Sequence, residues 1–411
     1  MWAVKELVTN KDAIEAELRQ RDPTVSLDSI VGFYDSRRTI QKRLDAVHGN
    51  IKSLAKDARH DEVARATIRS LREQERSITA ELSAVADELT NALLYLPNRL
   101  QPDVPRSPNK EDKDIIHIYG AAPHLPIDAL DHIALGRKHS LLDFDRAAKI
   151  AGSGFPLYRG VGARLEWGLI NFMLERAQRN GFEFMLLPLF NSTESLTASG
   201  NLPRFADELY STEDGWHAIP TAEVPITNLY RGEILDVAEL PLRVVSYSPC
   251  FRREAGGHGK LARGLMRMHQ FNKVETYSFC SPEQAKDEHQ NLVRNGESIL
   301  EDLGLHYRLA NLPSSDLAQQ SSQTFDIEVW LPKAEMFSEV SSASNCTDFQ
   351  ARRANIRFRG HQENQFVHTL NCSALATPRV MIALLETYQQ LDGSIVIPDV
   401  LRPYVGVNRI E

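Results

Sequence analysis

The stretch 250–276, CFRREAGGHGKLARGLMRMHQFNKVET, decides the fold of this chain. A strand-like run over residues 242–247 precedes it, a glycine-rich loop fills its middle, and an alternating run resumes over residues 268–275. Because side chains alternate between the two faces of a strand, we expect this hairpin to gather two arginines and two glutamates on one face of a sheet. They are Arg252, Glu254, Arg267 and Glu275.

Arginine beside glutamate in such a hairpin suits the binding of a nucleotide. Guanidinium groups grip phosphate oxygens with two parallel hydrogen bonds, and carboxylates hold an ammonium group, a metal ion or an adenine amino group. The alternative for a generic Arg-Arg-Glu sequence is an exposed hairpin with surface ion pairs. The length and order of the whole string favour the nucleotide-binding hypothesis.

Two glycine-rich phosphate loops are excluded by their residues. The run 256–260 ends in Gly-Lys, but Glu254 stands at the first P-loop glycine and Leu261 at the Ser/Thr position. The run 152–154, Gly-Ser-Gly, lacks the third glycine of a dinucleotide-binding fingerprint. If the chain binds a nucleotide, arginine side chains hold its phosphates.

Residues 27–96 are helical by period. Apolar residues step by four and three from Ile40 to Leu54 and again from Ile78 to Leu96, as in the a and d positions of a coiled coil. The polar stretch 56–62 between them predicts a turn, so we expect an antiparallel pair of helices. A coiled coil is more often a dimerisation device than a nucleic-acid arm, so the period by itself supports architecture only.

The charge of this helical segment is opposite to that of the chain. Residues 36–76 hold 11 Lys and Arg against 6 Asp and Glu, a net of +5 in a chain of net charge −8, so the remaining residues carry −13. One basic segment on an acidic protein favours localised contact with a nucleic acid. A solvated helix face of accidental sign stays an equal alternative on charge alone.

The length of 411 residues and mass of 46.3 kDa predict two domains. We expect a helical arm over residues 1–100, a polar, proline-bearing linker over 101–114, and a second domain over 115–411. In the second domain a helical stretch, 165–179, mixes with strand-like stretches at 182–187, 242–247 and 324–331. Without regular βαβ alternation, this mixture predicts an α+β fold around an antiparallel sheet.

Composition indicates an ordinary globular protein, with 42% hydrophobic and 25% charged residues and a mean hydropathy of −0.34. No apolar stretch approaches the roughly 18 residues of a membrane span, and acids and bases alternate where a signal peptide would lie. The four cysteines form no C-x-x-C pair, so we expect free thiols, no zinc site and a cytoplasmic location.

Five motifs and the helical hairpin together resemble one enzyme family. Residues 250–276 resemble motif 2 of class II aminoacyl-tRNA synthetases, and their Arg-Gly-Leu and His-Gln-Phe strings are most similar to those of bacterial seryl-tRNA synthetases. The helical hairpin resembles that family's tRNA arm. The remaining matches, in chain order, are motif 1 at 162–188, the serine-binding loop at 221–225, the metal and ATP strand at 339–350, and motif 3 at 371–389.

The resemblance implies a serine–tRNA ligase of class II fold. Such an enzyme activates L-serine with ATP to seryl-adenylate and transfers the seryl group to the 3′ end of tRNA(Ser), with tRNA(Sec) left open as a second substrate. It implies Mg²⁺ as a cofactor, tRNA binding through residues 36–90 and a homodimer through motif 1. No protein nucleophile is needed, because the carboxylate of serine attacks the α-phosphorus and catalysis consists of alignment and charge neutralisation.

The resemblance also implies roles for single residues. Catalysis is assigned to Arg252, Arg379 and Glu339. Serine binding is assigned to Thr221, Ala222, Glu223, Arg252, Glu275 and Ser373, with Thr221 and Glu275 taking the α-ammonium group. ATP binding is assigned to Arg252, Arg253, Glu254, Arg267, Met268, Phe271, Glu339, Val340, Ser341, Ser342 and Arg379. Mg²⁺ binding is assigned to Glu339 and Ser342.

Two other functions are weighed against this one. A specialised paralogue would supply a biosynthetic or resistance pathway or load a carrier protein, but carrier-loading relatives lack the long arm. A catalytically inactive regulator would not need the retained phosphate-gripping set. The chain departs from the family at Cys372, Ala374 and Pro378 of motif 3, which leaves the effect on ATP open, and at residues 259–262 of the motif 2 loop, which concerns acceptor-stem contacts.

Overall fold

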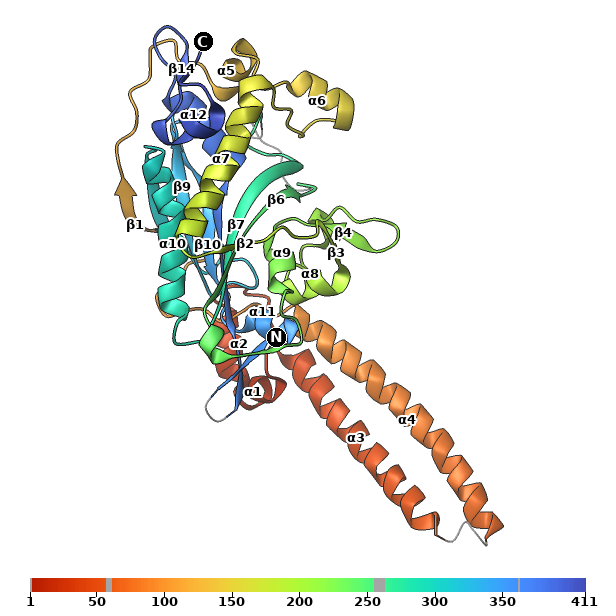
Figure 1. Ribbon diagram of the computed structural model, residues 1–411. Coiled ribbons are helices and arrows are strands. Elements are labelled where there is room, and N and C mark those ends of the chain that lie inside the picture. The colour runs from red at the N-terminus through yellow and green to blue at the C-terminus, as the bar shows by residue number, and fades with distance from the viewer. Residues whose placement is uncertain (1, 57–60, 255–262, 361–362) are drawn as a thin grey trace. The chain divides into compact units, whose positions relative to one another are not determined.

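The computed structural model describes residues 2–56, 61–254, 263–360 and 363–411 (Figure 1). The chain divides into two compact units, Met1–Pro97 and Asn98–Glu411. The expected turn at 56–62 lies mostly outside the described residues, as does the loop 255–262. Nothing in the described part of the chain is both long enough and apolar enough to form a membrane-spanning helix.

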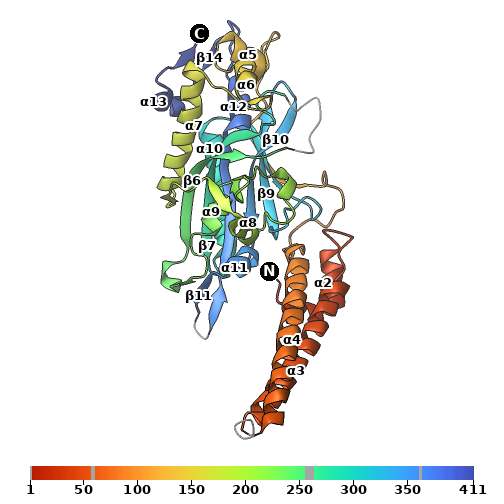
Figure 2. The same ribbon diagram turned by 90° about the vertical axis from the view of Figure 1, so that its right-hand side faces the viewer.

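The first unit is helical throughout. Two long helices, α3 (Asp28–Leu54) and α4 (Glu62–Leu94), lie side by side as an antiparallel pair (Figures 1 and 2). The helix α4 is capped by Asp61, whose Oδ1 accepts a 2.9 Å hydrogen bond from Val63 N. Two short helices that the sequence pattern did not indicate precede them, α1 (Val4–Thr9) and α2 (Lys11–Leu18).

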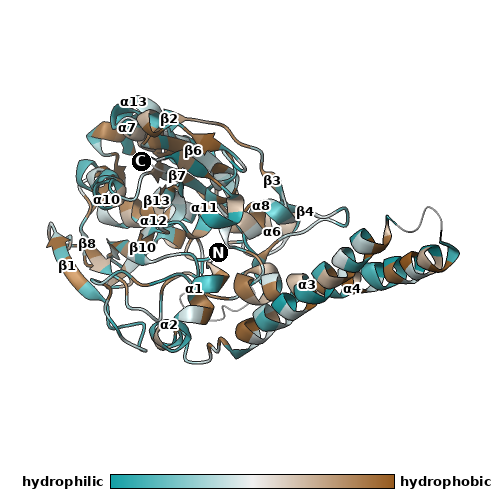
Figure 3. Ribbon diagram, turned by 90° about the horizontal axis from the view of Figure 1, so that it is seen from below, coloured by the Kyte–Doolittle hydropathy of each residue, from teal (hydrophilic) through white to brown (hydrophobic). Residues whose placement is uncertain are grey.

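Apolar residues at the predicted seam hold the helical pair together. Ile40, Leu44, Val47 and Ile78 are buried between α3 and α4, and hydrophilic and hydrophobic residues alternate along both helices (Figure 3). A second cluster joins α1 and α2 to the open end of the pair. Its buried members are Leu7, Ile14, Leu18, Val25, Leu27, Ile30, Leu89, Leu93 and Leu96.

The second unit is built on an eight-stranded sheet of order β1-β8-β9-β10-β13-β7-β6-β2. All neighbours are antiparallel except β2 and β6. The expected α+β fold with an N-terminal two-helix arm is confirmed. The strands are β1 (Asp114–Tyr119), β2 (Glu183–Phe184), β6 (Leu242–Phe251), β7 (Gln270–Cys280), β8 (Tyr307–Asn311), β9 (Gln323–Leu331), β10 (Met336–Asn345) and β13 (His368–Ala376).

Three helices cover one face of this sheet: α7 (Gly160–Arg179), α10 (Ala285–Asp302) and α12 (Thr377–Thr387) (Figure 1). They bury the larger apolar core with the strands. On the opposite face a smaller apolar cluster forms around Tyr277 and Phe279 of β7, and polar residues occupy the rest of that face. The remaining helices are α5 (His132–Lys138), α6 (Phe144–Ala151), α8 (Thr193–Ser199), α9 (Glu223–Thr227), α11 (Phe349–Ala354) and α13 (Arg402–Val405). The short strands are β3 (Phe190–Ser192), β4 (Trp216–Ala218), β5 (Ile234–Leu235), β11 (Arg357–Arg359), β12 (Asn364–Phe366), β14 (Ile395–Val396) and β15 (Arg409–Ile410).

The observed elements differ from the expected ones mainly at their ends. The helix expected at 165–179 begins at Gly160, and of the stretch 182–187 only Glu183–Phe184 is a strand. Residues 98–113 are tied to the second unit: Gln101 N donates a 3.0 Å hydrogen bond to Ser322 O, and Lys113 Nζ donates one of 2.7 Å to Glu328 Oε1. This segment therefore belongs to the second unit.

Candidate active site

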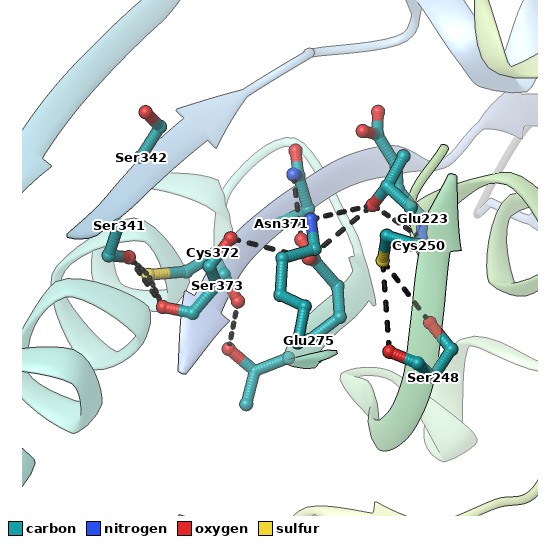
Figure 4. Close-up of polar contacts among 12 residues, drawn as sticks. Glu223, Ser248, Cys250, Glu275, Ser341, Ser342, Asn371, Cys372 and Ser373 are labelled. Atoms are coloured by element: carbon teal, nitrogen blue, oxygen red, sulfur yellow. Dashed lines mark hydrogen bonds and ion pairs between the residues drawn. The ribbon is translucent and has the colours of Figure 1, made fainter. Parts of the chain in front are cut away.

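The strand register decides which polar residues share the sheet face opposite α7, α10 and α12. Glu275 on β7 lies opposite Ser246 on β6 and Ser373 on β13, and paired residues project from the same face. Glu275 is fully buried, and its Oε1 accepts a 3.0 Å hydrogen bond from Asn371 Nδ2 (Figure 4). Ser373 Oγ lies 3.4 Å from Glu275 Oε2. A buried carboxylate therefore forms the centre of the polar face.

A lysine that the sequence analysis missed binds this carboxylate. Lys273 forms an ion pair with Glu275 and donates a 2.7 Å hydrogen bond to Thr221 Oγ1. The Thr221 hydroxyl also accepts a 3.1 Å hydrogen bond from Glu223 N and lies 3.5 Å from Glu275 Oε2. A hydroxyl accepts two hydrogen bonds and donates one, so that of Thr221 is fully engaged. The ammonium of Lys273 thus holds the two groups expected to bind the substrate ammonium.

A signal for Lys273 was present in the sequence. It precedes Glu275 by two residues on one strand, and such residues project from the same face. The side chain of Lys273 is only 8% exposed. A buried lysine requires a buried anion, because an unpaired charge in the interior is strongly disfavoured. Strand alternation together with this charge rule predicts the pair.

Glu223, at the start of α9, is a second buried carboxylate beside the first. Its Oε1 accepts a 2.7 Å hydrogen bond from Gln350 Nε2 on α11. Gln350 Oε1 in turn accepts hydrogen bonds from Tyr277 OH at 2.8 Å and Thr369 Oγ1 at 2.7 Å. Burial, with the charge of Glu275 in support, raises the pKa of Glu223 to about 7. Small changes in its surroundings therefore decide whether Glu223 is charged at neutral pH.

Arg252 follows β6 directly and keeps its alternation. Its backbone N–H donates a 3.0 Å hydrogen bond to His269 O, which extends the pairing of β6 with β7. The partly buried guanidinium lies over the ring of Phe271, 5.2 Å from the ring centroid. The cation and the aromatic ring therefore form one continuous surface.

The hairpin gathers its charged residues less regularly than expected. Of the four, Glu275 alone lies within a strand, because β6 ends at Phe251 and β7 begins at Gln270. Glu254 has a φ of 51°, a left-handed conformation that ends the strand's alternation. Its Oε2 forms a 2.7 Å ion pair with Arg267 Nε, while the Arg253 side chain is exposed.

A third polar group lies on β9 and β10. Ser342 Oγ lies 2.7 Å from Asp326 Oδ1 and 3.0 Å from Glu339 Oε1. Burial and the neighbouring Glu339 charge raise the pKa of Asp326 well above its usual range. From α12, Arg379 Nη1 donates a 2.5 Å hydrogen bond to Glu339 O and lies 3.8 Å from Glu339 Oε2. Sequence reasoning missed Asp326, which is within the expected strand but carries no motif.

Glu339 and Ser342 meet because β10 contains a bulge. Glu339 pairs with Glu328 and Ser342 with Asp326, and the register shifts between Glu339 and Ser341. Without the shift, residues three apart would project from opposite faces. Two carboxylates and a hydroxyl are oxygen ligands of the kind that Mg²⁺ prefers, so this donor set fits the expected cation. No cluster of three or more His, Cys, Asp or Glu suited to a metal occurs among the described residues.

Comparison with known proteins identifies the family. The family described as "tRNA synthetase class II core domain (G, H, P, S and T)" matches residues 208–388 of this chain. A serine–tRNA ligase of Geobacter sulfurreducens is 43% identical over 99% of this chain and 99% of its own length. This chain belongs to the serine–tRNA ligase family.

Solved structures of serine–tRNA ligases have the same fold along the whole chain. Seryl-tRNA synthetase of Pyrococcus horikoshii, complexed with ATP, matches with a TM-score of 0.92 and 32% identity over 100% of this chain and 99% of that chain. The cytoplasmic serine–tRNA ligase of Naegleria fowleri, in complex with AMP, matches with a TM-score of 0.85 and 27% identity over 98% of this chain and 96% of that chain.

Several residues that the serine–tRNA ligase resemblance assigned to ATP or serine have buried side chains. Met268 and Val340 are buried in the core beneath the helices, and Ala222 is buried in a separate apolar cluster. Ser341 Oγ contacts Cys372 Sγ at 3.1 Å, on the helix-covered side (Figure 4). Any part these four residues play in binding therefore falls to their main chain.

The departures of motif 3 from other serine–tRNA ligases also lie on the helix-covered side. Cys372 and Ala374 are fully buried in the large core. Gly296 on α10 faces Cys372: a Cβ there would lie 3.8 Å from Cys372 Sγ and 2.6 Å from Ile327 Cδ1. Pro378 lies in the first turn of α12, where a missing N–H removes no helical hydrogen bond. The added volume is directed away from the polar face.

All four cysteines are buried free thiols, as expected. Cys250 lies beside Ser248, with its sulfur 3.5 Å from Ser248 Oγ (Figure 4). Burial raises its pKa, so it is a weak nucleophile. Residues 256–262 of the motif 2 loop lie outside the described residues. The exclusion of a P-loop and the question of contacts with the tRNA acceptor stem both concern this loop.

Proposed function

We propose that this chain is an ATP-dependent serine–tRNA ligase that forms seryl-adenylate and charges tRNA(Ser). The observation that carries the proposal is the polar sheet face, where the Arg252 guanidinium lies over Phe271 on the same face as the buried Glu275. Membership of the serine–tRNA ligase family along the full length supports it. We place the enzyme in the cytoplasm, where tRNA and ATP are available.

The chemistry needs alignment of two anions. A carboxylate oxygen of serine attacks the α-phosphorus of ATP, the bond from this phosphorus to the bridging oxygen breaks, and pyrophosphate leaves. Arg252 neutralises the charge that builds on the α-phosphate, while Arg267 and Arg379 hold the outer phosphates. Phe271 stacks on adenine. A 3′-terminal hydroxyl of the tRNA then attacks the seryl carbonyl carbon, and AMP leaves.

Recognition of serine falls to the buried carboxylates. We assign the serine hydroxyl to Ser373 and Glu275, because both project from the polar face, where the hydroxyl of Ser373 can donate or accept and the carboxylate of Glu275 can accept. The ammonium of serine is left to Glu223, because Lys273 engages the Thr221 hydroxyl. Alanine would leave buried polar groups unpaired, and sites built this way discriminate by a factor of about 10⁴.

The raised pKa of Glu223 predicts a pH-dependent affinity for serine. Glu223 attracts an ammonium only when ionised, so the KM for serine in pyrophosphate exchange should fall about tenfold from pH 6 to pH 8. Glu223→Gln should bind serine more weakly and lose this dependence. An equal pH dependence in both proteins would contradict the assignment of the ammonium to Glu223.

Mg²⁺ would be held by Glu339 and Ser342, and we add Asp326 because its Oδ1 lies 2.7 Å from Ser342 Oγ. The ion would neutralise charge on the ATP phosphates. Glu339 also accepts a hydrogen bond from Arg379 through its main chain, so the same strand would serve the metal and an arginine.

The unit before residue 100 would bind tRNA through residues 36–90, and residues 115–411 would carry out catalysis. Arg65, Arg69 and Arg72 on α4 are exposed and available to RNA phosphates. The presence of this arm distinguishes the proposed tRNA ligase from an enzyme that loads a carrier protein.

We also propose a homodimer through residues 162–188. This segment exposes large apolar side chains: Trp167 is 54% exposed, Phe184 39% and Leu186 75%. Light scattering at micromolar concentration should give twice the 46.3 kDa chain mass. Leu186→Asp should weaken the dimer, whereas Leu391→Asp, at a 92% exposed position outside the segment, should not. A monomeric wild-type protein would contradict this proposal.

The function is tested by ATP–pyrophosphate exchange with serine, threonine and alanine, followed by charging assays. Exchange that depends on serine and charging of tRNA(Ser) would support the proposal. Serine activation with transfer to a carrier protein and not to tRNA would favour the specialised paralogue. Including tRNA(Sec) in the charging assay decides whether it is a second substrate.

A further inference from the structure

A buried glutamate outside the polar face joins three elements of the catalytic unit. Glu166 lies on α7 and is only 4% exposed. Its Oε1 accepts a 2.8 Å hydrogen bond from Asn272 Nδ2 on β7 and a 2.5 Å hydrogen bond from Thr377 Oγ1 at the start of α12. One carboxyl oxygen therefore links a helix, a strand and the first turn of a second helix.

The surroundings of Glu166 favour a neutral carboxyl group. Its Oε2 and the Tyr158 hydroxyl are buried without a hydrogen-bond partner among the described residues. Burial, opposed by the hydrogen bonds from Thr377 and Asn272, raises the pKa of Glu166 to about 7. Tyr247 OH donates a 3.1 Å hydrogen bond to Asn272 Oδ1, which turns the amide nitrogen toward Glu166. The geometry suits an acid that accepts two hydrogen bonds on one oxygen.

The two residues that donate to Glu166 adjoin the proposed ATP-binding residues. Asn272 follows Phe271, whose ring underlies the Arg252 guanidinium. Because successive strand residues project from opposite faces, fixing Asn272 from the helix side fixes the placement of Phe271 on the polar side. Thr377 precedes Arg379 by two residues in the first turn of α12.

We propose that Glu166 is a positioning residue for ATP, which acts through Asn272 on Phe271 and through Thr377 on Arg379. It touches no substrate, and the inference rests on the proposed ATP-dependent activation of serine. The alternative is that Glu166 contributes only to the packing of α7. The two differ in which kinetic constant changes, because a packing role has no preference for ATP over serine.

The test compares three variants of the full-length protein in pyrophosphate exchange. Glu166→Gln keeps an acceptor oxygen for Asn272 and Thr377 and replaces the neutral OH by NH₂, so its KM for ATP should stay within about twofold of wild type. Glu166→Leu fills the same volume without an acceptor. Thr377→Val removes one donor at equal volume. Both should raise the KM for ATP about tenfold or more, the factor expected when buried hydrogen bonds are removed, with the KM for serine changed less than about threefold.

A matched control separates positioning from loss of stability. Met173→Ala, at a fully buried position on α7, should lower the melting temperature as much as Glu166→Leu does and leave the KM for ATP near wild type. If Glu166→Leu does not fold, Thr377→Val still tests the link to α12.

The inference is overturned if Glu166→Leu or Thr377→Val raises both KM values equally, if both variants keep the wild-type KM for ATP, or if Met173→Ala raises it as much. Absence of serine-dependent exchange in the wild-type protein would refute the proposed function instead. In that case ATP affinity by titration calorimetry with the same variants still decides the role of Glu166.

Discussion

Arg252→Ala should lower serine-dependent pyrophosphate exchange by a factor of about 10³ or more. Its guanidinium is the partly buried cation over Phe271, and we propose that it neutralises the α-phosphate as the attacking carboxylate approaches. Removing one preorganised donor from a developing charge costs a factor of about 10² to 10³ in other enzymes, and here a full charge is removed as well. The effect should fall on kcat, because this charge builds only in the transition state.

Two further variants make this result specific. Arg252→Lys keeps a positive charge and loses the planar fork of donors, so it should recover only part of the activity. Arg146→Ala removes an exposed arginine that pairs with Asp143 and has no proposed role, so exchange should not change. Exchange by Arg252→Ala within tenfold of the wild-type rate would show that another group neutralises the α-phosphate.

Shortening the helical arm should abolish charging of tRNA and leave adenylate formation nearly unchanged. The deletion of residues 36–87, with a short flexible linker, removes the basic segment. It keeps Leu89, Leu93 and Ile30, whose packing with α1 and α2 holds the first unit together. Every proposed catalytic residue lies at or beyond Thr221, so pyrophosphate exchange should stay within about twofold of wild type.

Smaller changes measure the electrostatic share of this arm. The triple change of Arg65, Arg69 and Arg72 to alanine should raise the KM for tRNA and reduce the slope of its logarithm against log salt by about one for each phosphate that is no longer neutralised. The rate of exchange should not change. Glu73→Gln, on the same helix, is the control. It removes a negative charge, so it should not raise the KM for tRNA. If the shortened protein charges tRNA as well as the intact one, the arm is architecture only.

Much of the fold could be predicted because it depends on local period and order. The apolar steps from Ile40 and from Ile78 require a helical pair, since each helix buries its seam only against the other. The strand, loop and strand around residues 250–276 requires antiparallel pairing, and β6 and β7 follow it. The short helices α1 and α2 were not expected, because their few apolar residues become informative only when they pack against Leu89 and Leu93.

The sequence by itself determined the family, the helical arm and the residue types of the site, because these are written in period, order and spacing. The tertiary structure alone decided which side chains meet. Thr377 and Glu166 are 211 positions apart, and no local pattern relates them. The bulge in β10 reverses the alternation, so Glu339 shares its face with Ser342 and not with Ser341. A register shift of one residue moves every later side chain to the other face, and only the pairing of strands fixes where it occurs.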